Sequence, residues 1–165
     1  MDCGDVDQIL PWISGDLCGV LITHEHFDHI YGLNNLLELY PKVPVYTNRA
    51  GALGLMSDKL NLSRYWEIPF VLNAPQVVNV IQDGDDITLF DGINAHVVFT
   101  PGHSDGCITW LLDDVIFTGD SYIPGIKTVT NLPRSNRALA QHSEIMIRRL
   151  ADGRIIYPGH AAEFR

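Results

Sequence analysis

The sequence predicts a layered fold that combines helices with β-sheet, of the α/β or α+β class. Two observations carry this prediction. Between residues 5 and 56, short apolar runs of strand type alternate with segments whose apolar residues follow the helical period. From residue 75 to residue 120, strand-type runs follow one another with only short turns between them. The 165 residues are expected to form a single domain spanning 1–165.

The first half of the chain alternates between helix and strand patterns. Helical spacing of apolar residues predicts helices over 5–13, 29–40 and about 48–56. The apolar run GVLIT at 19–23 predicts a buried strand, and PKVPVYT at 41–47 predicts a strand that prolines introduce. Residues 57–75 show no clear period and predict a loop with some short structure.

The second half predicts mainly strands. Residues 75–103 indicate three strands divided by Asp-Gly turns, at 83–84 and 91–92. Residues 107–120 predict another pair that turns at Asp113–Asp114, so an antiparallel meander is expected. A last strand is expected in RIIYPGH at 154–160, after a helix over about 136–150 whose apolar side carries Leu139, Ile145, Met146 and Leu150.

Composition excludes several classes of function. A net charge of −9 argues against a nucleic-acid groove, because phosphate binding requires a clustered basic face. No apolar run approaches the roughly 18 residues that a membrane span needs. The start MDCGDVDQIL has no basic region of a secretory signal, and three widely spaced cysteines form no disulfide framework. A reduced, cytoplasmic setting is expected.

Four apolar strands each end at a residue of metal-ligand type. VLIT leads to His24, HVVFTPG to His103, VIFTG to Asp120 and IIYPG to His160. Loops at strand ends, held by a rigid scaffold, commonly carry functional residues. Glycine precedes the last three of these residues, which permits a sharp turn or a close approach to a bound ion.

The segment HEHFDH at 24–29 is the densest cluster of such residues. It is not the zinc-protease helix, because position 28 is aspartate where that pattern needs its second histidine. His24 and His26 can point the same way from an extended loop, whereas the adjacent Asp28 and His29 diverge toward a neighbouring ion. With the three strand-end residues that follow, the donors number seven, too many for one tetrahedral catalytic ion and suited to two ions that share a carboxylate.

Other candidates are weaker. His96 and His142 join no cluster and are expected to be structural, and Glu25 and Asp105 are expected to face solvent. Cys107 reads as a small buried residue. Lys127 and Arg134 follow Asp120 on a loop, where a surface role is favoured over binding of a substrate carboxylate.

The motifs HEHFDH, TPGHSDG, TGDS and YPGH, in this order, resemble those of the metallo-β-lactamase superfamily over residues 2–160. The resemblance implies an α+β fold, the four-layer αββα sandwich, with a binuclear metal centre. It assigns His24, His26 and His103 to the first metal, Asp28, His29 and His160 to the second, and Asp120 to both. Asp2 matches the family's aspartate behind the metal-binding loop, which orients one of the metal ligands.

The resemblance also narrows the branch. Asp120 stands where subclass B1 β-lactamases have cysteine, which is more similar to the glyoxalase II, ribonuclease Z and lactonase branches. Acidic charge disfavours ribonuclease Z, and the end of the sequence soon after His160 puts glutathione specificity in doubt. The first β-hairpin of the family is expected to be missing, which predicts an unpaired sheet edge and a homodimer or marginal stability.

The expected function is that of a metal-dependent hydrolase. Its nucleophile would be hydroxide on two divalent ions, most simply Zn²⁺ with Fe or Mn as alternatives, oriented by Asp28 and Asp120. The expected partner is a small ester, thioester, lactone or amide, with neither nucleic acid nor membrane involved. Two alternatives stay open: an iron sulfur dioxygenase with one metal, and a truncated relative that binds metal without turnover.

Overall fold

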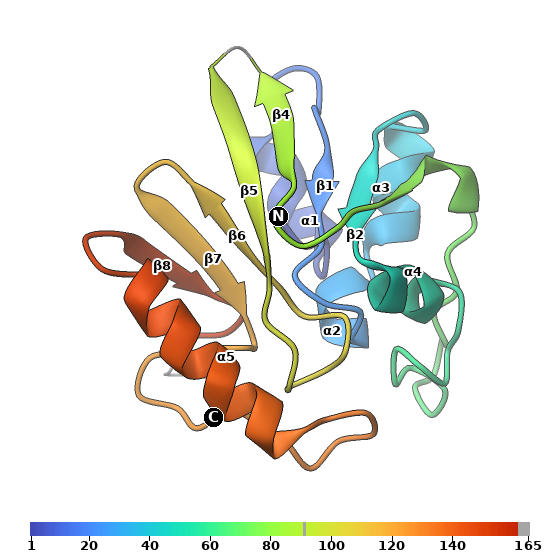
Figure 1. The fold of residues 1–165 in the computed structure, drawn as a ribbon. Helices are drawn as coiled ribbons and strands as arrows, with labels where there is room; N and C mark the ends of the chain where they lie inside the picture. Colours follow the sequence, from blue (N-terminus) through green and yellow to red (C-terminus); the bar gives the residue numbers. More distant parts are fainter. Residues whose placement is uncertain (91, 162–165) are drawn as a thin grey trace.

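The computed structural model describes residues 1–90 and 92–161, which form two β-sheets with helices outside them (Figure 1). In chain order the elements are α1 (Val6–Ile9), η1 (Leu10–Trp12), β1 (Val20–Leu21), α2 (Phe27–Ile30), α3 (Leu33–Leu39), β2 (Val45–Thr47), α4 (Arg49–Leu55), η2 (Pro75–Val77), β3 (Val78–Val80), β4 (Asp86–Phe90), β5 (Ile93–Phe99), β6 (Ile108–Leu112), β7 (Val115–Gly119), α5 (Arg137–Leu150) and β8 (Ile155–Pro158).

The two sheets differ in topology. The smaller sheet has the order β1-β2-β3, and its strands are parallel. The larger sheet has the order β4-β5-β6-β7-β8, antiparallel up to β7, after which β8 pairs parallel with β7. The expected antiparallel meander is therefore wrong at its first strand, because β3 pairs with β2 instead, and the separately predicted last strand, β8, joins the large sheet in parallel.

Three apolar clusters show that the fold has four layers. The first, which includes Ile22, Leu33 and Val45, lies between the small sheet and its helices. The second lies between the two sheets and joins Leu21 to Val97 and Trp110. The third packs Ile147 of α5 on the large sheet. These layers confirm the α+β, αββα sandwich, and no strand precedes β1 in the described residues.

Local sequence explains where several helices begin. The side chain of Asn48 accepts the N–H of Gly51 at 2.8 Å and so caps α4. Asn136 caps α5 by accepting from the N–H groups of Ala138 and Leu139. The expected helix over 5–13 is divided into α1 and η1, and Pro11 lies within η1. The Asp-Gly turn at 91–92 includes Asp91, which lies outside the described residues.

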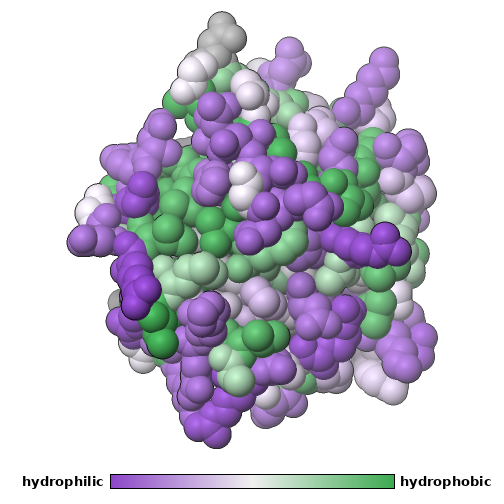
Figure 2. Space-filling model, in the orientation of Figure 1, coloured by the Kyte–Doolittle hydropathy of each residue, from purple (hydrophilic) through white to green (hydrophobic). Residues whose placement is uncertain are grey.

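The apolar side expected for α5 is wrong at Leu139 and Ile145 but correct at Leu150, which packs against the third cluster. Leu139 and Ile145 are exposed, whereas the buried positions are Ala140, Ser143 and Ile147. On the face seen in Figure 2, apolar side chains gather over part of the large sheet beside α5, and hydrophilic residues occupy most of the rest. Among the described helices, none combines the length and the apolar character needed to cross a membrane.

Candidate metal centre

The predicted ligands meet because the loops that carry them leave the sheets at the same end. Residues 22–26 follow β1, residues 100–107 follow β5, Asp120 follows β7 and His160 follows β8. In Figure 1 the ends of β5 and β7 and the helix α2 lie at the lower end of the two sheets. This arrangement places segments distant in sequence around one small volume.

Three histidines form the first group. His24 and His26 belong to the loop after β1, and His103 belongs to the loop between β5 and β6. The ring centroid of His24 lies 4.7 Å from that of His26 and 4.9 Å from that of His103. His26 Nδ1 lies 2.9 Å from His103 Nε2. All three side chains are buried, and each offers a nitrogen within 4.8 Å of the others.

Asp28, His29 and His160 form the second group. His160 Nε2 lies 3.2 Å from Asp28 Oδ2 and 3.3 Å from His29 Nε2. His29 is buried, but Asp28 and His160 have exposed fractions of 51% and 45%. The second group is therefore the side of the cluster that meets solvent.

Asp120 lies between the two groups. Its Oδ2 is 3.6 Å from His103 Nε2, while its Oδ1 is 3.5 Å from the Nε2 atoms of both His29 and His160. Gly119 turns the chain here with φ of +50°, and a Cβ on Gly159 would collide with the Asp120 carboxylate. The backbone thus comes as close to Asp120 as only glycine permits.

Burial keeps the first group neutral. It lowers the pKa of His24 well below its usual value, helped by the neighbouring His29, and it lowers the pKa of His26 to about 3. Burial also lowers the pKa of His103. A neutral imidazole has the free nitrogen lone pair that metal binding requires.

The second group has the opposite electrostatics. Burial alone disfavours charge on His29, but the nearby carboxylates of Asp120 and Asp2 outweigh it and raise the pKa of His29 to about 10. Burial likewise opposes ionisation of Asp120, yet His29 and His103 lower its pKa overall. In the metal-free chain, the protonated ring of His29 therefore places a positive charge against these carboxylates. A bound cation would have the same carboxylate partners.

The donor set fits divalent cations. His24 Nε2 and Asp120 Oδ1 are buried, and neither has a hydrogen-bond partner among the described residues. An unsatisfied buried polar group costs about 1–3 kcal/mol, so such atoms need a ligand or water. Imidazole nitrogen and carboxylate oxygen are ligands of zinc and of iron. The cluster has the free donor atoms that a bound cation uses.

Asp2 supports this cluster from behind, as the resemblance implies. Its Oδ2 lies 2.9 Å from His29 Nδ1 and accepts the Thr23 hydroxyl at 2.7 Å, and its Oδ1 accepts the Thr23 N–H at 2.6 Å. The aspartate therefore fixes the ring orientation of His29 and the start of the loop that carries His24.

Replacing Asp2 by alanine is expected to weaken cation binding about 10- to 100-fold, since His29 loses the acceptor that orients its ring. Competition with a chromophoric chelator measures the affinity. Asp7→Ala, an exposed aspartate on α1, is the matched control. Equal affinities in the two variants would contradict the role of Asp2.

The expectation that Glu25 faces solvent is wrong. Its side chain is 1% exposed, and its Oε2 accepts the Ser104 hydroxyl at 2.9 Å. A Cβ on Gly54 or Gly106 would collide with it, so both glycines provide the space that it fills. Burial raises the pKa of Glu25. Glu25 therefore joins the loop of His24 and His26 to the loop of His103.

The remaining candidates lie outside the cluster. His96 is half exposed and contacts Asp86 at 2.8 Å, and His142 is exposed on α5. Cys107 is buried, as expected, and burial raises the pKa of its thiol to about 12. Arg134 contacts the partly exposed Asp105 at 2.9 Å, and Lys127 lies beside a separate small hollow.

A cavity of about 370 Å³ opens over the cluster. Its polar wall consists of His26, Asp28, His103 and Asp120, and its apolar wall consists of Phe27, Leu62, Trp66, Val129 and Leu132. Apart from Phe27, the sequence offered no signal for the apolar wall, because the loops 57–75 and 121–135 carry no motif. Val129 also contributes its carbonyl oxygen, 3.0 Å from His103 Nδ1, so this loop orients a predicted ligand.

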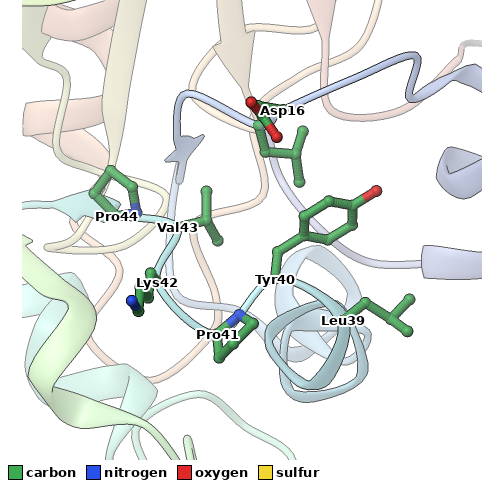
Figure 3. A pocket seen from close by; sticks show the side chains of 8 residues that line it. Asp16, Leu39, Tyr40, Pro41, Lys42, Val43 and Pro44 are labelled. Carbon is green, nitrogen blue, oxygen red and sulfur yellow. The ribbon is translucent and has the colours of Figure 1, made fainter.

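A second hollow of about 340 Å³ lies away from the cluster (Figure 3). It is lined by residues that precede β1 and β2, including Asp16, Tyr40 and Pro44, so it lies toward the opposite ends of these strands. It shares no lining residue with the cavity over the cluster.

Comparison with known proteins identifies the family. Residues 10–160 match the family model of the metallo-beta-lactamase superfamily. The chain is 34% identical over 130 residues to a hydroxyacylglutathione hydrolase of Shewanella halifaxensis, covering 76% of the chain and 42% of that protein. It is 31% identical over 150 residues to a probable metallo-hydrolase of Streptococcus pyogenes, covering 87% and 64%.

A solved structure has a similar fold. A crystal structure of the protein TTHA1623 in a di-iron-bound form superposes with a TM-score of 0.78 and 25% identity, covering 97% of this chain and 80% of that one. The chain spans less than two thirds of the length of the two curated relatives. The order of the motifs, the four layers and the family match lead to one conclusion: the chain belongs to the metallo-beta-lactamase superfamily.

Proposed function

We propose that the chain is a metal-dependent hydrolase that holds two divalent cations in this centre and cleaves a small ester, thioester, lactone or amide. His24, His26 and His103 hold one cation, and Asp28, His29 and His160 hold the other. The observation that carries the proposal is the position of Asp120, whose two carboxylate oxygens face different histidine groups at 3.5–3.6 Å.

A divalent cation, when bound, lowers the pKa of a coordinated water toward about 7 and offsets negative charge on the reacting oxygens. The chain supplies the positioning. Asp120, whose two oxygens face the two groups, would orient a water in the space between them. Asp28, half exposed at the mouth of the cavity, accepts a proton from that water and returns it to the leaving group.

The relatives support hydrolysis as the class of reaction. One is named a hydroxyacylglutathione hydrolase and another a probable metallo-hydrolase, and both align over most of this chain. Zinc is the simplest occupant of this imidazole-rich set, and iron or manganese satisfies the same ligands. The similar structure in a di-iron-bound form supports iron as an occupant as well.

The test combines metal analysis with a panel of substrates. Purified protein, loaded separately with zinc, iron and manganese, is assayed on esters, thioesters, lactones and amides while oxygen is monitored. About two cations per chain together with hydrolysis support the proposal. One iron with oxygen consumption would indicate a sulfur dioxygenase, and bound metal without turnover would indicate a binding protein; either result rejects the hydrolase.

Removing the cations is expected to lower stability as well as activity. A ligand that binds only the folded state stabilises it by about 4 kcal/mol at a thousandfold excess over Kd, which for a chain of this size corresponds to about 10 °C in Tm. Thermal unfolding with and without a chelator measures the shift, and adding metal back must restore it. An unchanged Tm would mean that the cluster binds no cation tightly.

A further inference from the structure

We infer that the substrate carries an apolar acyl arm that leaves the metal centre between Leu62 and Leu132 and enters a second cavity. This inference rests on the proposed hydrolase function and names the class of substrate. The second cavity measures about 390 Å³ and is lined by Lys59, Leu62, Arg64, Tyr65, Leu132 and Pro133. Leu62 and Leu132 also line the cavity over the metal ligands, so the two spaces share a wall.

The character of the second cavity indicates what it binds. Leucine, proline and tyrosine side chains form most of its lining, and no acidic residue is among them. The two basic residues of this lining, Lys59 and Arg64, are exposed, and Arg64 is paired with Asp58 at 3.0 Å. A hydrocarbon chain would pack against the leucine and proline side chains of this lining and leave water as it does so.

The wall residue Leu62 is held in place by buried polar neighbours. Asn61 and Ser63 are both fully buried, and the amide of Asn61 donates to the carbonyl groups of Gly54 and Phe70. Between them Leu62 adopts φ of +67°, a left-handed conformation that is unfavourable for leucine. Such strain persists only where the surroundings impose it, which is common at ligand sites.

Leu132, which forms the opposite wall, is linked through Ser135 to the predicted metal ligand His103. Ser135 donates its N–H to the Leu132 carbonyl at 3.1 Å and its hydroxyl to the His103 carbonyl at 2.7 Å. Arg134, which also has φ of +67°, contacts Asp105 in the loop of His103. The position of Leu132 is therefore tied to the metal centre.

The test is a series of thioesters that share one leaving group and differ in acyl length from acetyl to decanoyl. Each methylene that leaves water contributes about fourfold, so octanoyl should exceed acetyl in kcat/KM by about a hundredfold once several methylenes are enclosed. Leu62→Asn introduces a residue that tolerates positive φ and replaces the apolar wall by a polar one. It should reduce the octanoyl-to-acetyl ratio by about tenfold or more, and Leu132→Ala should do the same.

Leu39→Ala is the matched control, because Leu39 is an exposed leucine in the separate hollow of Figure 3. Its octanoyl-to-acetyl ratio should equal that of the unchanged chain. Calorimetric titration of the zinc-loaded protein with acetate and with octanoate gives a second readout that needs no turnover, and octanoate should bind at least tenfold more tightly than acetate.

The outcomes separate the two proposals. Hydrolysis of acetyl and octanoyl thioesters at equal kcat/KM, with equal binding of acetate and octanoate, overturns the acyl arm and leaves the hydrolase standing. Absence of hydrolysis on every substrate rejects the hydrolase, and a preference for octanoate that Leu62→Asn removes still supports an apolar ligand. An unchanged ratio in both leucine variants overturns the inference.

Discussion

Asp120→Ala is expected to abolish turnover and to release both cations. Its two carboxylate oxygens face different histidine groups, Oδ2 toward His103 and Oδ1 toward His29 and His160. Removing the side chain takes a donor and a negative charge from both positions at once. No neighbouring carboxylate can replace it, because Asp28 lies on the solvent side of the second group.

Metal content per chain and kcat/KM on the best substrate of the panel measure this effect. The unchanged protein should hold about two cations, and Asp120→Ala should hold fewer than about one, with activity at the level of the chelated protein. Asp120→Asn preserves the shape but offers a single oxygen and no charge, so we expect about one cation and a large loss of activity. Asp86→Ala, an exposed carboxylate beside His96, is the control and should change neither quantity.

Two results would contradict the proposal that Asp120 contributes to both cation positions. The first is full activity in Asp120→Ala. The second is selective loss of one cation in Asp120→Ala with the other bound at unchanged affinity. Because the Asp120 side chain is only 14% exposed, thermal unfolding of each variant in the presence of chelator must show that the fold itself is retained.

Much of the site was predictable because strands end where side chains can converge. Apolar runs that stop at histidine or aspartate identify strand ends in sequence, and the sheets bring these ends together in space. The order of the four motifs then distributes the seven donors between two groups. His24, His26 and His103 do lie together, as do Asp28, His29 and His160.

Glu25 shows what a local pattern cannot reveal. A charged residue in a loop normally faces solvent, and nothing near it in sequence indicates otherwise. Its partner, Ser104, and one of the glycines that make room for it, Gly106, lie some eighty positions later in the chain. Burial of this carboxyl follows from the packing of two loops, which only the tertiary structure specifies.

The predicted helix boundaries were wrong for a similar reason. The periodic segment 29–40 suggested one helix, but the chain forms α2 and α3 with a break at Tyr31 and Gly32. The segment containing Cys3 passes against this break, where the Cys3 N–H donates to the His29 carbonyl and Gly32 donates to the Cys3 carbonyl. These contacts replace the hydrogen bonds that a continuous helix would make.

In α5 the mistake lies in the face assigned to the core. Small and polar residues, Ala140 and Ser143, pack inward, and the Ser143 hydroxyl donates to the Pro101 carbonyl at 2.7 Å. A larger apolar residue, Ile145, faces solvent. Apolar periodicity alone therefore misplaced a helix whose first turns lie so close to Pro101 and Gly102, in the loop after β5, that they require small side chains.

Trp110→Ala is expected to cause the largest loss of stability. Trp110 is fully buried in the cluster between the two sheets, where it packs with Leu21 and Val97. Its indole N–H donates to the Ile22 carbonyl at 3.0 Å, which links β6 to the end of β1. Truncating such a side chain costs about 3–5 kcal/mol, and the buried Ile22 carbonyl loses its partner in addition.

Urea unfolding followed by far-UV circular dichroism measures this loss without relying on tryptophan emission. Trp12→Ala is the matched control, since Trp12 is 85% exposed and its removal should change the free energy of unfolding by less than about 0.5 kcal/mol. Trp110→Phe retains most of the volume but not the donor, and it should lose about 1–3 kcal/mol. Because Ile22 lies two residues before His24, we also expect Trp110→Phe to bind cations more weakly while Trp12→Ala does not. Equal urea midpoints for Trp110→Ala and Trp12→Ala would show that the contact between the sheets does not depend on this side chain.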